Sequence, residues 1–342
     1  MISFECDYNN GAHPKVLGRL IETNGRQSLT YGFDEWSDAA RQKIREACQT
    51  PDAQIFFLSG GTQTNMTVID GMAAPYQAVI TAETGHINVH EAGAIEFTGH
   101  KVIALPSHDG KMDAAELQHY MDWFVHDEST EHLAQPGLVY ITFPTEYGTL
   151  YSADEIDRIH AVCLRYGLKL FIDGARLGYG LEAIGSDVDL PFLSAHCEAF
   201  YIGGTKVGAL CGEAVVFPRA ADMPAHFFSI IKQHGALMAK GRLIGLQFDA
   251  LFTDGLYFRI ARHAIEMAAK MKRLFAERGY RFSIDSPTNQ QFVIIPNDKV
   301  KELERQVLFT HWAPYGSDAT ECRFVTSWAT TDEDLQTLST II

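Results

Sequence analysis

Residues 168 to 176 read Leu168-Lys-Leu-Phe-Ile-Asp-Gly-Ala-Arg176. The apolar run at 169–172 predicts a buried strand, which ends in a carboxylate, a glycine and an arginine. In open α/β sheets, ligands bind at the carboxyl ends of the strands, so Asp173 stands where a ligand would be held. A turn salt bridge between Asp173 and Arg176 is the simpler alternative.

Similar apolar runs recur on both sides of this stretch and alternate with helical patterns. They lack the strict polar and apolar alternation of half-exposed strands, which is typical of strands covered by helices on both faces. Ser152-Ala-Asp-Glu155 predicts a helix start, and Gly167 its end. The predicted strands are 54–59, 78–81, 101–105, 138–143, 169–172, 199–202 and 214–217. The fold class is therefore α/β, with a mainly parallel seven-stranded sheet.

The pattern changes after about residue 217 to long segments rich in Ala, Met, Leu and Lys. Helices are predicted at 225–252, 256–278, 298–306 and 331–342, and strands at 292–295 and 322–327. We therefore expect a large α/β domain at 1–250, with the N-terminal segment near the functional site. A small C-terminal α+β domain would occupy 251–342.

Charge and cysteine usage limit the classes of partner and location. The formal net charge of −15 would repel nucleic acid and anionic membrane surfaces, so a small metabolite is the expected partner. The six cysteines show no metal-ligand spacing, and the first residues lack the basic and apolar regions of a signal peptide. Apolar stretches are too short to span a bilayer. We expect reduced thiols and a cytoplasmic location.

A glycine-rich turn follows the first predicted strand, in Ser59-Gly-Gly-Thr-Gln-Thr-Asn65. Backbone N–H groups at a helix start favour an anion, and Gly60 and Gly61 allow it to approach closely. A tight turn with a threonine cap explains the same residues equally well. The stretch is neither a Walker loop nor the G-x-G-x-x-G fingerprint, which argues against a nicotinamide-dependent dehydrogenase.

A lysine follows the strand at 199–202, in Gly203-Gly-Thr-Lys-Val-Gly208. If Lys206 is partly buried among these small residues, its pKa falls and its amine becomes a Schiff-base nucleophile. Taken alone, a solvent-exposed turn lysine is the more ordinary interpretation. Taken together, an anion site, a strand-end aspartate and a strand-end lysine suit one cofactor that carries a phosphate, a pyridine nitrogen and an aldehyde.

The order and spacing of these motifs resemble the fold-type I pyridoxal phosphate (PLP) enzymes, and more narrowly the threonine aldolase branch of the β-eliminating lyases. The resemblance covers nearly the full length. The motifs that carry it are Ser59-Gly-Gly-Thr-Gln-Thr-Asn65, Glu83-Thr-Gly-His-Ile-Asn-Val-His-Glu-Ala-Gly93, Ile172-Asp-Gly-Ala-Arg176 and Gly203-Gly-Thr-Lys206. It implies a PLP-dependent transferase-like fold with PLP as the cofactor.

The resemblance also implies a role for each matched residue. Lys206 would carry PLP as a Schiff base, and Asp173 would keep the pyridine nitrogen protonated, which makes the ring a strong electron sink. His86 would stack on the ring face. Arg323 would grip the substrate carboxylate through two parallel hydrogen bonds. The phosphate would be held by Gly60, Gly61 and Thr62, and Arg176 would lie beside the ring oxygen and the substrate.

The reaction that the resemblance implies is cleavage of L-threonine, L-allo-threonine or a related β-hydroxy amino acid to glycine and an aldehyde, through a quinonoid intermediate. The base that removes the β-hydroxyl proton is His86 or Glu146, and some family members have a histidine in the region of Glu146. His86 and His90 lack the H-E-x-x-H order and a nearby third ligand, so no metal site is expected.

Other activities remain open on the same scaffold. A β-eliminating lyase acting on an aromatic or sulfur amino acid would use the same lysine, aspartate and arginine, as would a transaminase. A non-catalytic PLP-binding protein is a further alternative. The resemblance also implies a homodimer or homotetramer with active sites at the subunit interface. Lys232, Lys240 and Arg242 would then reach the neighbouring phosphate, unless they are simply solvated.

Overall fold

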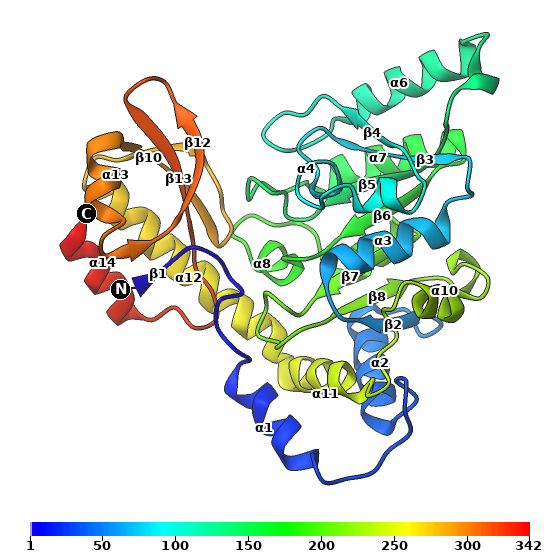
Figure 1. The fold of residues 1–342 in the computed structure, drawn as a ribbon, viewed down its shortest axis with the longest axis horizontal. Helices are drawn as coiled ribbons and strands as arrows, with labels where there is room; N and C mark the ends of the chain where they lie inside the picture. Colours follow the sequence, from blue (N-terminus) through cyan, green and yellow to red (C-terminus); the bar gives the residue numbers. More distant parts are fainter. Residues whose placement is uncertain (1) are drawn as a thin grey trace.

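The computed structural model describes residues 2–342, which form a large sheet-based part and a smaller part beside it (Figure 1). The central sheet has seven strands in the order β2-β8-β7-β6-β5-β3-β4. All are parallel except β8, which runs antiparallel to β2 and β7. The strands are β2 (Gln54–Leu58), β3 (Gln77–Ala82), β4 (Val102–Leu105), β5 (Gln135–Thr142), β6 (Lys169–Asp173), β7 (Ala199–Gly203) and β8 (Glu213–Phe217). The α/β fold class and each predicted strand of this sheet are confirmed.

Helices cover both faces of the sheet, which explains the continuous apolar runs. In β6, Leu170 and Ile172 pack into one apolar core, while Phe171 packs into a second core on the other face. The first core includes α2 (Glu35–Cys48), α6 (Ala114–His126), α7 (Ala153–Tyr166), α9 (Leu190–Ala195) and α11 (Arg242–Leu251). The second includes α3 (Gly61–Met72) and α10 (Phe227–Gln233). Both faces are therefore buried.

The continuous helix predicted at 225–252 is wrong, because the chain forms α10 and α11 with a turn between them. Gly235 has a φ of +68°, which interrupts the helix after α10. Gly241 then packs so tightly on Gly32 that an added Cβ would lie 2.2 Å from the Gly32 nitrogen. The helical composition of the segment is overridden at these two glycines. The next predicted helix is confirmed as α12 (Leu256–Glu277).

The smaller part has a four-stranded antiparallel sheet in the order β12-β13-β10-β9. It contains β9 (Arg281–Ile284), β10 (Gln290–Pro296), β12 (Thr310–Tyr315) and β13 (Ala319–Val325), with α13 (Asn297–Leu303) and α14 (Asp332–Ile341). The predicted strands at 292–295 and 322–327 correspond to β10 and β13. The edge strands β9 and β12 were not predicted, because their side chains are mostly polar or half-exposed.

The N-terminal segment (residues 2–13) links the two parts. Strand β1 (Ile2–Ser3) pairs with β11 (Val307–Leu308), and Phe4 is buried in the core of the smaller part. Both ends of the chain lie there (Figure 1). The segment then crosses to α1 (Pro14–Thr23), which packs on α11 of the larger part.

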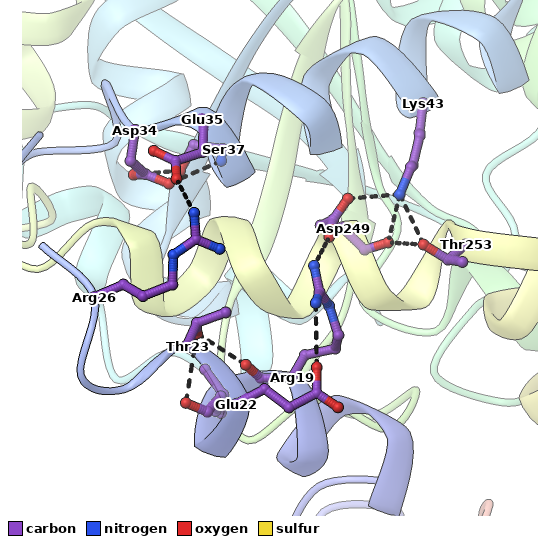
Figure 2. A network of polar contacts seen from close by, with 11 residues as sticks. Arg19, Glu22, Thr23, Arg26, Asp34, Glu35, Ser37, Lys43, Asp249 and Thr253 are labelled. Atoms are coloured by element: carbon purple, nitrogen blue, oxygen red, sulfur yellow. Dashed lines mark hydrogen bonds and ion pairs between the residues drawn. The ribbon is translucent and has the colours of Figure 1, made fainter. Parts of the chain in front are cut away.

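A network of ion pairs fixes α1 against its neighbours (Figure 2). The buried carboxylate of Asp249 on α11 accepts hydrogen bonds from Arg19 of α1 at 3.2 Å and from Lys43 of α2 at 2.5 Å. Lys43 also donates to Thr253. Helices α1, α2 and α11 are thus joined at the carboxylate of Asp249. Within residues 2–342, no helix is long and apolar enough to cross a membrane.

Candidate active site

Two glycines bring the ends of β6 and β7 into close contact. The Gly203 N–H donates to the Gly174 carbonyl oxygen at 2.9 Å. A Cβ added at Gly174 would lie 1.9 Å from the Tyr201 carbonyl oxygen, and one at Gly203 would lie 2.3 Å from the Ala175 carbonyl oxygen. Only glycine fits such backbone contacts. Asp173 directly precedes Gly174, and Lys206 follows three residues after Gly203, so the contact between the two glycines holds both side chains at the same edge of the sheet.

A cavity of about 300 Å³ lies at this edge. It gathers most of the residues singled out in the sequence, although they come from five different parts of the chain. Its lining includes Gly60, Gly61, Thr62, His86, Glu146, Asp173, Arg176 and Lys206. Tyr8, Asn65, Tyr201, Thr205 and Glu213 also line it. The motifs thus converge on one site, as expected for a single cofactor.

The start of α3 provides an anion-binding end of the cavity. Gly60 is the N-cap and no side chain caps the helix, which runs for 12 residues from Gly61. The Ser59 and Gln63 side chains bond to each other. The first N–H groups of α3 are therefore free to bind a phosphate, and the helix dipole favours it.

Asp173 is buried at the centre of a hydrogen-bond network. Its Oδ2 accepts from the Tyr140 hydroxyl at 2.5 Å and from Asn65 Nδ2 at 2.9 Å, while Oδ1 accepts from the Ala175 N–H at 2.9 Å. These three hydrogen bonds fix the orientation of the carboxyl group. An anion fixed in this way suits a protonated pyridine nitrogen.

The same amide links Asp173 to His86. Asn65 Nδ2 also donates to Glu91 Oε1 at 2.7 Å, and this oxygen lies 2.7 Å from His86 Nδ1. Burial lowers the pKa of His86, but the hydrogen bond to Glu91 and the charge of Asp173 outweigh it, so the pKa is raised overall. Glu91 orients the imidazole and leaves Nε2 as its free nitrogen.

Glu146 is buried beside His86. Its Oε1 accepts from the His86 backbone N–H at 2.9 Å and from the Thr142 hydroxyl at 2.7 Å. Oε2 makes no hydrogen bond with any described residue. Burial raises the pKa of Glu146 above its ordinary value. A carboxyl with a raised pKa and a free oxygen in a cavity is suited to take up and release a proton.

Lys206 lies in a setting that favours its neutral amine. Burial, followed by the charge of Arg176, lowers the pKa of Lys206, and the nearby acids Asp7, Asp173 and Glu213 partly oppose this. Its Nζ lies 5.8 Å from the ring centre of Tyr8. A lysine with a lowered pKa is a competent nucleophile toward an aldehyde.

Two predicted arginines lie differently: Arg176 lines the cavity, whereas Arg323 is on β13 of the smaller part and is not among the residues that line it. Arg176 forms a two-point ion pair with Asp7, at 2.7 and 2.9 Å, and Asn289 donates to Asp7 at 3.0 Å. Arg323 lies over the Trp312 ring, and its buried Nε has no hydrogen-bond partner among the described residues. Burial lowers the pKa of Arg323 to about 10. Its other two nitrogens donate to Gln290 Oε1 and Thr310 Oγ1, each at 3.3 Å, so Nε is the nitrogen left for an anionic group.

Three predicted cations lie away from this cavity. Arg242 donates to the carbonyl oxygens of Thr23 and Arg26, each at 2.6 Å. Lys240 lines a separate hollow of about 400 Å³, and Lys232 lies over the Tyr31 ring. Within one chain, none of the three lines the Lys206 cavity.

Several residues of the site were not singled out from the sequence. Asn65 and Glu91 lie inside the quoted motifs. Their polar side chains in these glycine-containing motifs were the available signal. Asp7 and Tyr8 had no such signal, because the N-terminal segment reaches the cavity only through the fold. Among residues 2–342, no three His, Cys, Asp or Glu side chains are grouped to hold a metal.

The residues present fit PLP: an uncapped helix start for the phosphate, a fixed carboxylate for the pyridine nitrogen, and a buried lysine for the aldehyde. Known proteins support this assignment. Residues 24–286 match the family model described as Beta-eliminating lyase. The structure of a Leishmania major threonine aldolase superposes with a TM-score of 0.96 at 38% identity, covering 100% of this chain and 98% of that one.

More distant relatives agree. A low specificity L-threonine aldolase from a Pseudomonas species is 29% identical, over 98% of this chain and 95% of its own length. A Thermus thermophilus aspartate aminotransferase variant shares the fold alone, with a TM-score of 0.73 at 12% identity over 99% of this chain and 90% of that one. Because the family model spans most of its length, the chain belongs to the beta-eliminating lyase family.

Proposed function

We propose that this protein is a PLP-dependent lyase that cleaves the Cα–Cβ bond of a β-hydroxy-α-amino acid to give glycine and an aldehyde. L-Threonine and L-allo-threonine are the proposed substrates. The observation that carries the proposal is the convergence of Lys206, Asp173 and Glu146 on one cavity. The 38% identity with a threonine aldolase favours this reaction over β-elimination or transamination.

PLP, when bound, supplies an electron sink for the negative charge that develops at Cα. Lys206 offers the neutral amine that binds the aldehyde carbon. Asp173 holds the proton at the pyridine nitrogen, and Asn65 and Tyr140 keep its carboxylate in place. The N–H groups at the start of α3, around Gly60, Gly61 and Thr62, bind the phosphate.

The two arginines divide the binding of the substrate carboxylate. Arg323 has the free Nε and binds the carboxylate directly. Arg176 already bonds to Asp7, so it contributes charge and one remaining nitrogen on the cofactor side of the substrate. Fixing the carboxylate sets the orientation of the substrate at Cα. The bond at Cα that is held perpendicular to the cofactor ring is the one that breaks.

Glu146 is the proposed base for the β-hydroxyl group. Its free Oε2 takes the hydroxyl proton, while the Thr142 hydroxyl and the His86 N–H hold Oε1. His86 is the second candidate, with Nε2 as the free nitrogen and Glu91 on the other side of the ring. After cleavage, the same proton is available for return to the product.

A second copy of the chain is proposed to complete the site, in a homodimer or homotetramer. Lys232, Lys240 and Arg242 lie outside the cavity of their own chain, so their proposed contact with phosphate requires a neighbour. Exposed apolar side chains at Leu29 and Phe33 lie on the same region and suit a subunit contact. The free cysteines agree with action in the reducing cytoplasm.

The proposal is tested with purified, PLP-loaded protein given L-threonine or L-allo-threonine, with glycine, acetaldehyde and pyruvate measured together. Equal amounts of glycine and acetaldehyde, lost in Lys206→Ala, are expected. Pyruvate without glycine would assign the protein to the β-eliminating reactions instead. Conversion of the cofactor to its pyridoxamine form would indicate transamination.

A further inference from the structure

Glu213 is a buried acid of the cavity that the proposed reaction leaves without a role. It is the first residue of β8, where it pairs with Gly203 of β7 on one side and Leu58 of β2 on the other. Gly203 leads to Lys206, and Leu58 leads to the glycine-rich start of α3. Glu213 therefore stands between the lysine and the anion-binding helix end, at 3% exposure.

The carboxyl group of Glu213 supports the loop that carries Lys206. Its Oε2 accepts the Gly204 N–H at 3.1 Å, and Oε1 accepts the Thr205 hydroxyl at 2.8 Å. Thr205 Oγ1 in turn accepts the Gly212 N–H at 3.0 Å. The two residues that precede Lys206 are thus both bonded to this one side chain.

The charge of Glu213 is matched differently from the charges of the other acids near Lys206. Asp7 has the guanidinium of Arg176, and Asp173 has three hydrogen-bond donors. Glu213 has two neutral donors and forms no ion pair among the described residues. Burial raises the pKa of Glu213 to about 8, and Lys206 is the cation that favours the ionised form of Glu213. A buried carboxylate needs either such a cation or a proton.

Other groups packed on Glu213 are neutral or acidic. Asp173 on β6 opposes its ionisation. Tyr201 on β7, Cys211 in the loop and Tyr257 on α12 all have pKa values raised by burial, with the charge of Glu213 adding to the effect, so they stay protonated at neutral pH. Among these groups, Lys206 is the one whose positive charge favours the ionised form of Glu213.

We propose that Glu213 is the positioning residue of Lys206. Its carboxyl group holds Gly204 and Thr205, the two residues that precede the lysine, and its negative charge acts on the lysine nitrogen in the same buried cavity. The inference rests on the proposed function, because it assigns Lys206 to the cofactor. Its consequence is that Glu213 sets the pH at which the nitrogen of Lys206 loses its proton.

The test compares PLP-loaded wild type with Glu213→Gln, Glu213→Asp and Thr205→Val, following the visible absorbance of the lysine-bound cofactor against pH. The apo proteins are tested in parallel by the pH dependence of the rate of PLP capture, which requires the neutral amine. Glu198→Gln is the matched control, since Glu198 is a partly buried acid directly before β7 that bonds to Leu170 and Arg219 instead.

Removing the negative charge disfavours the protonated nitrogen, so Glu213→Gln is expected to lower both pH midpoints by about one unit or more. Thr205→Val removes a hydrogen bond that stabilises the ionised form of Glu213. It is expected to lower both pH midpoints by less than Glu213→Gln does. Glu213→Asp and Glu198→Gln are expected to stay near wild type. Wild-type midpoints in both Glu213→Gln and Thr205→Val would overturn the inference.

The two proposals fail in distinguishable ways. If wild type shows no visible band that depends on Lys206, the proposed function itself fails. If the wild-type band is present and depends on Lys206 but does not respond to the Glu213 and Thr205 changes, the cofactor assignment stands and the role of Glu213 is refuted. Should Glu213→Gln not fold, Thr205→Val still decides, because it leaves the carboxyl group in place.

Discussion

The two sides of the cavity are built in different ways. The sheet side carries Asp173 and Lys206 on strand ends that are fixed by backbone contacts at Gly174 and Gly203. The opposite side is assembled from the N-terminal segment and the smaller part of the chain, where ion pairs and hydrogen bonds from Asp7 join Arg176 to Asn289. Backbone contacts cannot adjust by rotating a side chain, whereas the polar contacts can.

This difference suggests a division of labour. Cofactor chemistry requires a lysine and an aspartate held at fixed positions, which the sheet side provides. Substrate binding benefits from groups that reorganise when a carboxylate enters, and Arg323, with its unpaired Nε, lies on the adjustable side. Changes on the sheet side should therefore affect the reaction, and changes on the other side should affect substrate binding or stability.

Glu146 provides the largest expected effect, because it is the proposed base on the sheet side. Its raised pKa places the acid limb of the kcat profile above the usual carboxyl range, with activity rising as the pH passes through that pKa. Glu146→Gln should lower kcat by about a hundredfold to ten-thousandfold and remove this limb. The measurement is kcat against pH. A limb that persists in Glu146→Gln but disappears in His86→Asn would make His86 the base.

Asp7→Ala tests the ion pair between the N-terminal segment and Arg176 on the opposite side. It leaves the buried Arg176 without its partner, which should reduce the free energy of unfolding by about 3 to 5 kcal/mol. Burial raises the pKa of Asp7, but Arg176 and Lys206 lower it further, so the net pKa is depressed. The stabilisation is therefore present at neutral pH and lost as the pH falls through the depressed pKa.

Urea unfolding at pH 7 and at low pH measures this effect. Asp7→Asn is the control that keeps the shape of the side chain and one hydrogen bond. Equal stability of wild type and Asp7→Ala across the pH range would show that the N-terminal segment does not hold the site together.

Arg323→Gln should separate binding from chemistry. Losing a charged hydrogen bond to the substrate carboxylate costs about 1.5 to 3 kcal/mol, so KM should rise by about tenfold to a hundredfold. The affinity for PLP should stay unchanged, because Arg323 is not among the residues that line the cavity. Steady-state kinetics and PLP titration measure the two quantities. A loss of PLP affinity with an unchanged KM would reverse the proposed division.

Arg19→Ala provides the smallest expected effect. Arg19 is partly exposed, and Lys43 remains beside Asp249, so the loss should be below about 1 kcal/mol and smaller still at high salt. Thermal unfolding at low and high salt measures it, with kcat expected to match wild type. A large loss of activity would mean that the ion-pair network of Figure 2 influences the arrangement of residues in the cavity.

The sheet side was largely predictable from sequence, and the reason is local. A buried strand, its closing glycine and its chemical residue are contiguous in both Ile172-Asp-Gly-Ala-Arg176 and Gly203-Gly-Thr-Lys206. The glycines that mark these motifs are the ones that the backbone contacts require. The local sequence was therefore sufficient to predict both each strand and the functional residue that follows it.

The opposite side was not predictable in the same way. Asp7 and Asn289 are 282 residues apart, and neither lies in a pattern that predicts burial. Glu213 begins an ordinary strand, and its position between β2 and β7 follows from the strand order rather than from its neighbours. The break between α10 and α11 likewise involves a tertiary fit, the close packing of Gly241 on Gly32, which overrides helical composition.

Trapping the cofactor tests the central claim most directly. PLP-loaded protein is reduced with borohydride, digested and analysed by mass spectrometry, with and without prior incubation with L-threonine. We predict a single phosphopyridoxyl adduct on the peptide that contains Lys206, reduced in amount when substrate is present. An adduct on another lysine, or none at all, would contradict the assignment of the site.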